Sequence, residues 1–394
     1  MKLGWSDEDE QFRVELVSFL DEHTPPEAKA RRDFVEPSAT EIDIPEWARR
    51  WQALLFDHGW MVPGYPPELG GRNATPIQTM VYLEELCRWG VPRSLNFGGY
   101  AIVAPSLLEF GNEEQKRLAP AAIRGDTVWC VGMSEPGAGS DLAALSTKAE
   151  RHGDIFVVNG QKVWTSYASF ADRCLLYVRT DPSVPKHKGI SALIVDMASP
   201  GVDVRPLRHI TGGADFAEVF FTDVEVPVEH LVGAENDGWR ITTGSLAHER
   251  GALWVEGVAR AQAAVDDLWA LARRRGLLDD AGVRRTLARA TQRVASLRAL
   301  GYQGFASFAG GGSAPQHSYL KLATSELGKE LYELGMQLQG PWGAVADAER
   351  GEEGGRWAHG WFVSFASTIA GGTSQIQRNI IATRILGLPR SDRP

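Results

Sequence analysis

Cysteine is scarce in this chain of 394 residues, which contains three, Cys87, Cys130 and Cys174, and no C-x-x-C pair. This odd and widely spaced set suggests neither a disulfide framework nor a zinc site, so we predict no metal. Proteins without disulfides are typical of reducing compartments, and we expect the cytoplasm.

Long apolar runs and an excess of positive charge are also missing. No segment reaches the roughly 20 apolar residues of a membrane-spanning helix. The first twenty residues carry five acidic side chains, unlike a signal peptide. The formal net charge of −9 argues against a surface that attracts nucleic acid or anionic lipid. We therefore expect neither a nucleic acid nor a membrane as partner.

The chain lacks the alternation of strands and helices that a Rossmann domain requires. Helical periodicity fills the first third, where Phe12, Leu16, Phe19 and Leu20 recur at three-and-four spacing. Short β-rich runs fill the middle third, and long amphipathic segments follow it. The predicted fold class is α+β, with an N-terminal helical domain (1–124), a middle antiparallel β domain (125–235) and a C-terminal helical domain (236–394).

The middle domain contains one strong turn signal. The run IFVVNGQKVW includes Asn159-Gly160, a pair that favours a two-residue hairpin because both residues tolerate positive φ. We therefore predict a turn between two strands at this pair.

One motif is suited to binding a polar ligand. In VGMSEPGAGSDLAAL, Gly137 and Gly139 expose backbone amides, and Ser134 and Ser140 add hydroxyl groups, as phosphates or a polar heterocycle require. The alternative is a tight turn between domains. The motif is not the G-x-G-x-x-G fingerprint of dinucleotide binding.

Two further motifs carry comparable groups. In KVWTS, Trp164 offers a flat surface beside Ser166, and the alternative is an ordinary core tryptophan. In AGGTSQIQRNII, Thr373 or Ser374 is the expected N-cap of a helix, behind glycines that allow close approach of a ligand. The alternative there is an ordinary capped helix.

Together with LAHER, these motifs resemble those of the acyl-CoA dehydrogenases in order and approximate spacing, and the resemblance covers nearly the whole chain. In that family a helical domain, a β domain and a four-helix bundle hold FAD against the thioester of an acyl-CoA. The resemblance implies α,β-dehydrogenation to the trans-2-enoyl-CoA, as in fatty acid β-oxidation, with an electron transfer flavoprotein as electron acceptor.

The resemblance also implies roles for individual residues. Substrate contacts are expected at Ser140 and Arg250, and FAD contacts at Ser134, Gly139, Trp164, Ser166, Gln337, Gly340, Thr373 and Gln375. Two departures from the family pattern lie nearby. Pro341 and Trp342 replace the usual pair in QLQGPWG. The Phe-Gly expected after the first long C-terminal helix is missing from ARRRGLLDDAGVRRTLARATQ, and the sequence leaves open whether Arg273 or Arg274 takes the place of the usual Arg.

The resemblance places the catalytic base outside the last motif. Many family members carry a Glu immediately before the final Gly-Thr, where this chain has Gly371. In a smaller branch, which includes the isovaleryl and long-chain enzymes, the base comes from the first long C-terminal helix, directly before an Arg. This chain has Glu249-Arg250 there. We predict that Glu249 removes the α-proton and that the Gly371 N–H donates to the thioester oxygen; the alternative for Glu249 is a buried ion pair or an exposed helix charge.

Several expectations about assembly and activity stay open. The same pattern resembles actinobacterial members that form an α2β2 heterotetramer with a second subunit, often on steroid side chains, and a homotetramer competes with it. One rival function is a flavin-dependent oxidase or monooxygenase of the same fold. Another is a partner subunit that holds FAD or CoA without turnover. The length, branching and ring content of the acyl group cannot be read from the sequence.

Overall fold

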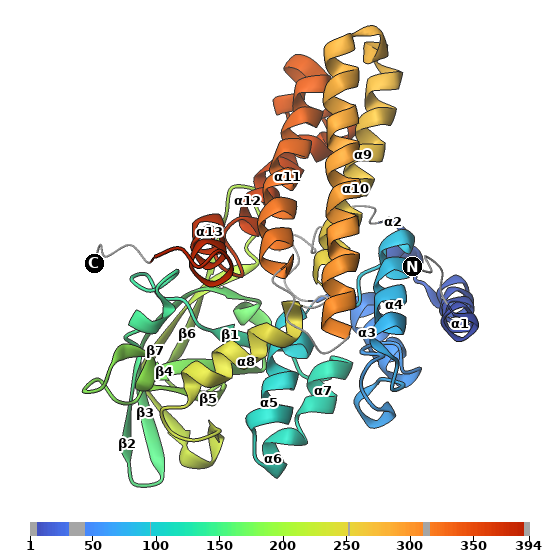
Figure 1. The fold of residues 1–394 in the computed structure, drawn as a ribbon. Coiled ribbons are helices and arrows are strands. Elements are labelled where there is room, and N and C mark those ends of the chain that lie inside the picture. Colours follow the sequence, from blue (N-terminus) through green and yellow to red (C-terminus); the bar gives the residue numbers. More distant parts are fainter. Residues whose placement is uncertain (1–5, 31–43, 95, 251–252, 310–315, 390–394) are drawn as a thin grey trace. The chain divides into compact units, whose positions relative to one another are not determined.

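The computed structural model describes residues 6–30, 44–94, 96–250, 253–309 and 316–389, with backbone only for some residues at helix ends, among them 245–250. The chain divides into two compact units (Figure 1). Among the described residues, the first comprises 6–30, 44–79, 90–94 and 96–249, and the second comprises 80–89, 250, 253–309 and 316–389.

The first unit begins with helices whose apolar faces are buried. A capping box between Ser6 and Asp9 starts the first of them, and Leu16 and Leu20 on its inner face are fully buried. None of the described helices is long and apolar enough to cross a membrane. Residues 80–89 of α4 belong to the second unit. The helices between residues 6 and 250 are α1 (Asp7–His23), α2 (Pro26–Ala30), α3 (Glu46–Asp57), α4 (Pro76–Trp89), α5 (Ala104–Phe110), α6 (Glu113–Lys116), α7 (Ala119–Arg124) and α8 (Gly238–Arg250).

The described strands of the first unit form one sheet in the order β6-β7-β3-β2-β4-β5-β8, with β1 paired to β4. Most neighbours are antiparallel, as predicted, but β1 and β2 each run parallel to β4. Alternating residues such as Phe156, Val158, Leu176 and Leu193 form its core. The strands are β1 (Trp129–Gly132), β2 (Lys148–His152), β3 (Ile155–Ser166), β4 (Arg173–Arg179), β5 (Ile190–Asp196), β6 (Val202–Leu207), β7 (Phe216–Pro227) and β8 (Leu231–Val232).

The hairpin predicted at Asn159-Gly160 is wrong, because β3 continues through this pair and the turn before it lies at Gly153. The Asn159 side chain instead exchanges two hydrogen bonds with Asp223 of β7, at 2.9 Å and 3.0 Å. Gly160 has a φ of 152°, and a Cβ there would lie 2.6 Å from the Thr147 Cα. The glycine therefore allows β3 to pass close to Thr147, directly before β2, at a point where β3 shifts its register against β7.

The second unit is helical, and its long helices α9, α10 and α11 lie side by side (Figure 1). Helices α11 and α12 pack through reciprocal contacts of an aromatic ring with a glycine. A Cβ at Gly335 of α11 would lie 2.1 Å from the Trp357 ring, and one at Gly360 of α12 would lie 2.2 Å from the Tyr332 ring. The helices of this unit are α9 (Leu253–Arg274), α10 (Ala281–Ala309), α11 (Gln316–Gln339), α12 (Arg356–Ser367) and α13 (Ser374–Ile380).

Candidate active site

The first predicted contact segment follows β1 and contains a tight turn. Glu135 and Ala138 pair through two backbone hydrogen bonds of 3.0 Å each. The turn leaves Gly139 and Ser140 exposed and Ser134 half-buried. Because a Cβ at Gly139 would meet no heavy atom within 4 Å, a ligand can approach this backbone closely.

The second predicted segment lies at the end of β3, where a register shift against β7 marks a bulge. Trp164 at the bulge has a φ of 59°, and its side chain is 59% exposed, so it is not a core tryptophan. Its ring meets Phe216 edge to face, with 6.0 Å between centroids. Ser166 is exposed as well. The Val163 N–H donates to the Ser134 carbonyl at 2.9 Å, which joins the two predicted segments directly.

A buried ion pair that the sequence analysis missed joins the same two segments. The Lys162 Nζ lies 2.8 Å from the Glu135 Oε1, and the two side chains are 0% and 5% exposed. Burial raises the pKa of the Glu135 carboxyl, but the Lys162 charge and several hydrogen bonds outweigh it and lower the pKa to about 2. Burial lowers the pKa of Lys162, and Glu135 opposes that shift. The sequence carries a signal for the burial of Lys162: inward and outward side chains alternate along a strand, and Lys162 lies in phase with the inward residues Phe156 and Val158.

The last predicted segment is a turn whose carbonyls are held by side chains. Gly371 and Gly372 have φ values of 64° and 92°. The Gln377 Nε2 donates to the Gly371 carbonyl at 3.0 Å, and the Lys321 Nζ of α11 donates to the Gly372 carbonyl at 2.6 Å. A trans peptide directs its N–H away from its carbonyl. The N–H groups of Gly372 and Thr373 therefore point away from these side chains, and neither has an acceptor among the described residues.

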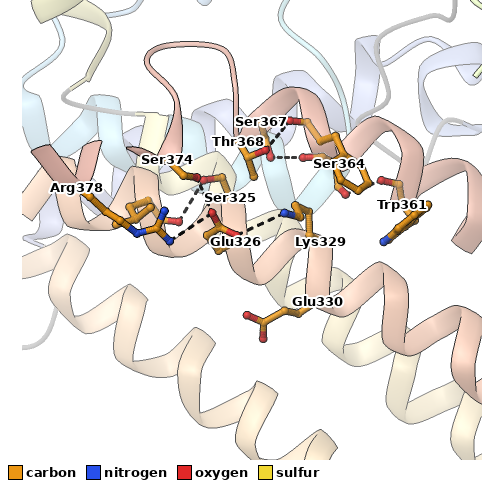
Figure 2. A network of polar contacts seen from close by, with 12 residues as sticks. Ser325, Glu326, Lys329, Glu330, Trp361, Ser364, Ser367, Thr368, Ser374 and Arg378 are labelled. Atoms are coloured by element: carbon orange, nitrogen blue, oxygen red, sulfur yellow. Dashed lines mark hydrogen bonds and ion pairs between the residues drawn. The ribbon is translucent and has the colours of Figure 1, made fainter. Parts of the chain in front are cut away.

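The start of α13 is anchored to α11 through one carboxylate. Thr373, one of the two predicted candidates, is the N-cap of this helix. Its Oγ1 accepts a hydrogen bond from the Ile376 N–H at 3.2 Å. Ser374 is buried and donates to the Glu326 Oε1 at 2.5 Å. Figure 2 shows Glu326 between Ser374, Arg378 and Lys329, with ion-pair distances of 3.7 Å to Arg378 and 3.6 Å to Lys329. The Ser374 hydrogen bond, helped by both cations, lowers the pKa of Glu326 although burial opposes it.

Gln337 and Gly340, at the end of α11, line a cavity of about 670 Å³. Arg274 and Arg275 line the same cavity, so the segment that departs from the family's Phe-Gly pattern lies near Gln337 and Gly340. Both arginines already have carboxylate partners. The Arg275 Nη1 lies 2.7 Å from the Glu352 Oε1, and Arg274 pairs with the next residue of that loop. The complete lining is Leu271, Arg274, Arg275, Leu277, Gln337, Leu338, Gly340 and Glu352.

The predicted site residues fall into two sets, one in each unit. Glu249 and Arg250 end α8, and the predicted helix is present there, but their side chains lie outside the described residues. Gln375 is exposed at the start of α13. The first unit carries Ser134, Gly139, Ser140, Trp164 and Ser166, and the second carries Gln337, Gly340, Gly371, Thr373 and Gln375.

Three domain families match the chain in order. Residues 6–126 match the acyl-CoA dehydrogenase N-terminal domain, residues 130–224 the middle domain, and residues 236–386 the C-terminal domain. The chain belongs to the acyl-CoA dehydrogenase family. Members of this family are flavin-dependent oxidoreductases, so the predicted family and enzyme class are confirmed.

Full-length relatives support the same assignment. The acyl-CoA dehydrogenase IpdE1 of Mycobacterium tuberculosis is 37% identical over 385 residues, which are 97% of this chain and 98% of that protein. A solved structure of the Tcur3481-Tcur3483 steroid ACAD is 31% identical, with a TM-score of 0.86 over 99% of this chain and 100% of that one. The ChsE4-ChsE5 complex from Mycobacterium tuberculosis is 32% identical, with a TM-score of 0.84 and the same coverage. The predicted α+β fold of an acyl-CoA dehydrogenase is thereby confirmed.

Proposed function

We propose that this chain binds FAD and dehydrogenates an acyl-CoA thioester to the trans-2-enoyl-CoA, with Glu249 as the base. FAD, when bound, supplies the acceptor for the hydride that leaves the β-carbon, at flavin N5. The chain itself must bind the thioester, remove the α-proton and stabilise the charge that develops on the carbonyl oxygen.

The described side chains and backbone groups fit a ligand that is both aromatic and anionic. The exposed Trp164 ring offers a flat surface, and the open backbone at Gly139 allows a ligand to approach closely. The unpartnered N–H groups of Gly372 and Thr373 offer donors to negative charge. The residues that would hold FAD are Ser134, Gly139, Trp164, Ser166, Gln337, Gly340, Thr373 and Gln375.

One observation supports Glu249 over a carboxylate near the glycine turn. Residues 370–374 contain no acid, and Glu326, the carboxylate bonded to this segment, already binds Ser374, Arg378 and Lys329. Its pKa is lowered, whereas a base for a weakly acidic α-proton needs a raised pKa. Glu326 is therefore an anchor, and Glu249 is the carboxylate that the family pattern offers instead.

The remaining residues have supporting roles in this proposal. The Gly371 N–H donates to the thioester oxygen, where negative charge grows as the α-proton leaves. The turn is held by Gln377 and Lys321 before substrate arrives, so the donor needs little reorganisation. Arg250 positions the base or contacts the CoA portion, and Ser140 contacts CoA.

The test is the Glu249→Gln variant, mixed without oxygen with straight-chain, branched and steroid side-chain acyl-CoA thioesters. We expect flavin bleaching to slow by about 10²–10⁴-fold, the typical contribution of a general base. Glu256→Gln, on the following helix α9, is the matched control and should bleach normally. Near wild-type bleaching in Glu249→Gln would reject the assignment. Rapid reoxidation of the reduced wild-type flavin by air would favour an oxidase or monooxygenase.

We also propose that the chain works with a second, different subunit on an acyl group that derives from a steroid. Each of the two similar solved structures, the Tcur3481-Tcur3483 steroid ACAD and the ChsE4-ChsE5 complex, is named for two proteins. The proposal includes a cytoplasmic tetramer, a β-oxidation type of pathway and an electron transfer flavoprotein as acceptor. Purification alone and with candidate partners tests it: a homotetramer with full flavin content and full activity on its own would reject the second subunit.

A further inference from the structure

The Glu135 carboxylate closes the segment that carries Ser134 and Ser140. It accepts the Ser146 N–H at 2.6 Å, the Ser146 hydroxyl at 2.8 Å, the Thr147 N–H at 2.8 Å and the Lys162 ammonium at 2.8 Å. The two ends of the segment therefore meet at one buried carboxylate.

The Lys162 ammonium extends this connection to β3. Besides Glu135, it donates to the Met133 carbonyl at 3.1 Å. The next residue of β3, Val163, donates its N–H to the Ser134 carbonyl at 2.9 Å. Lys162 thus binds Met133 and Glu135, the two neighbours of Ser134, and Val163 binds the Ser134 carbonyl itself.

Stability alone does not account for two buried charges at this place. A buried ion pair replaced by apolar residues of similar volume often leaves a protein equally or more stable, because desolvation offsets the attraction between the charges. What apolar residues cannot reproduce is the set of directed bonds from Lys162 and Glu135. Trp164, two residues after Lys162, holds a backbone conformation that persists only where its surroundings determine it.

We infer that Glu135 and Lys162 are positioning residues: their ion pair sets Ser134 and Trp164 in the relative arrangement that binds the ring system of FAD. The inference rests on the proposed function, which places both residues at FAD. The pair acts through the segment and the strand that it joins and does not itself contact the ligand.

The experiment compares the single variants Glu135→Gln and Lys162→Met with the double variant that carries both changes. Thermal unfolding of the protein without FAD reports the fold, and titration with FAD, followed by fluorescence and by the visible spectrum, reports the site. Each single change should lower the melting temperature, since each leaves a buried partner unpaired. The double variant leaves no unpaired buried charge and should regain part of that loss, although the introduced amide has only one accepting oxygen for the Ser146 and Thr147 donors. It should bind FAD at least about tenfold more weakly, a change of about 1.4 kcal/mol.

Lys148→Met is the matched control, because it breaks an exposed pair with Glu150 in the neighbouring strand β2. It should change neither measurement. If the double variant does not fold, the FAD affinity of Glu135→Gln alone decides, because glutamine keeps the shape of glutamate and one accepting oxygen.

Two outcomes overturn the inference, and they are distinguishable. In the first, the folded double variant, or Glu135→Gln where that variant decides, binds FAD with the affinity and spectrum of the wild type. The pair would then have a purely structural role, while FAD binding and acyl-CoA oxidation by the wild type would still support the proposed function. Failure of the wild-type protein to bind FAD would overturn the proposed function and this inference together.

Discussion

Replacement of Lys321 by methionine tests how the turn at Gly371 and Gly372 is held. The Lys321 Nζ lies 2.6 Å from the Gly372 carbonyl oxygen. Burial lowers the pKa of Lys321, while the charge of Glu326 opposes that shift. Methionine keeps much of the apolar stem and removes the donor, so the variant isolates this hydrogen bond.

The size of the effect follows from the exposure of the two groups. A hydrogen bond from a charged donor contributes about 1.5–3 kcal/mol where the acceptor is left without a partner. Gly372 and Lys321 are both half-buried, so water can reach the freed carbonyl and the ammonium no longer needs desolvation. We expect a cost at or below the low end, about 1 kcal/mol. This cost should favour local opening of the turn and increase the opening equilibrium constant about fivefold.

Amide hydrogen exchange can measure that opening. The Ser374 N–H donates to the Thr368 carbonyl at 3.0 Å, and the Gln377 N–H donates to the Thr373 carbonyl at 2.9 Å. Both amides should exchange about fivefold faster in Lys321→Met.

The controls come from the same helix. Lys321→Arg should restore most of the protection, because it keeps a cationic donor at this position. Lys329→Met removes a cation that pairs with Glu326 at 3.6 Å, and it should change exchange less. Unchanged exchange in Lys321→Met, or equal acceleration in both methionine variants, would refute the reasoning.

Two further predictions concern stability. Gly335→Ala should lower the free energy of unfolding in urea by about 1–3 kcal/mol, because its Cβ would lie 2.1 Å from the Trp357 ring. The control Gly328→Ala in the same helix meets nothing within 4 Å and should stabilise by about 0.5–1 kcal/mol; a similar effect of both changes would contradict the packing argument. The stability difference between wild type and Glu135→Gln should narrow as pH falls from the ordinary carboxyl pKa of 4.5 toward about 2, because over that range the unfolded carboxyl takes up a proton while the native carboxylate stays ionised. A difference that stays constant from neutral pH to about pH 3 in urea unfolding would contradict the lowered pKa.

The order of helices and strands could be predicted from sequence, because periodic apolar positions such as Leu16 and Leu20 decide it locally. The turn at Asn159-Gly160 could not, since contacts with residues far along the chain override the local preference of that pair. Trp164 had two interpretations from sequence, and the bulge that exposes it depends on pairing with β7.

The candidate site shows the same division between local and distant causes. Thr373 as a possible N-cap is readable from its neighbours, and the structure assigns it that role. The bond from Lys321 to Gly372 joins residues 51 positions apart, and no local pattern indicates it. Glu135 and Lys162 lie next to Ser134 and near Trp164 in the two motifs predicted to contact FAD. Their pairing depends on how the strands align, which the local sequence does not indicate.

The conformation of Gly371 constrains how this chain could change during evolution. A side chain at that position would meet no heavy atom within 4 Å among the described residues, so space alone would admit one. Its φ of 64°, however, is a conformation that costs an L-residue about 1–2 kcal/mol. A single mutation that introduced a carboxylate there would carry this backbone penalty at once, and any benefit would come only after the neighbouring turn had adapted. In the proposed function, with Glu249 as the base, the glycine avoids this penalty and the chain needs no carboxylate at this position.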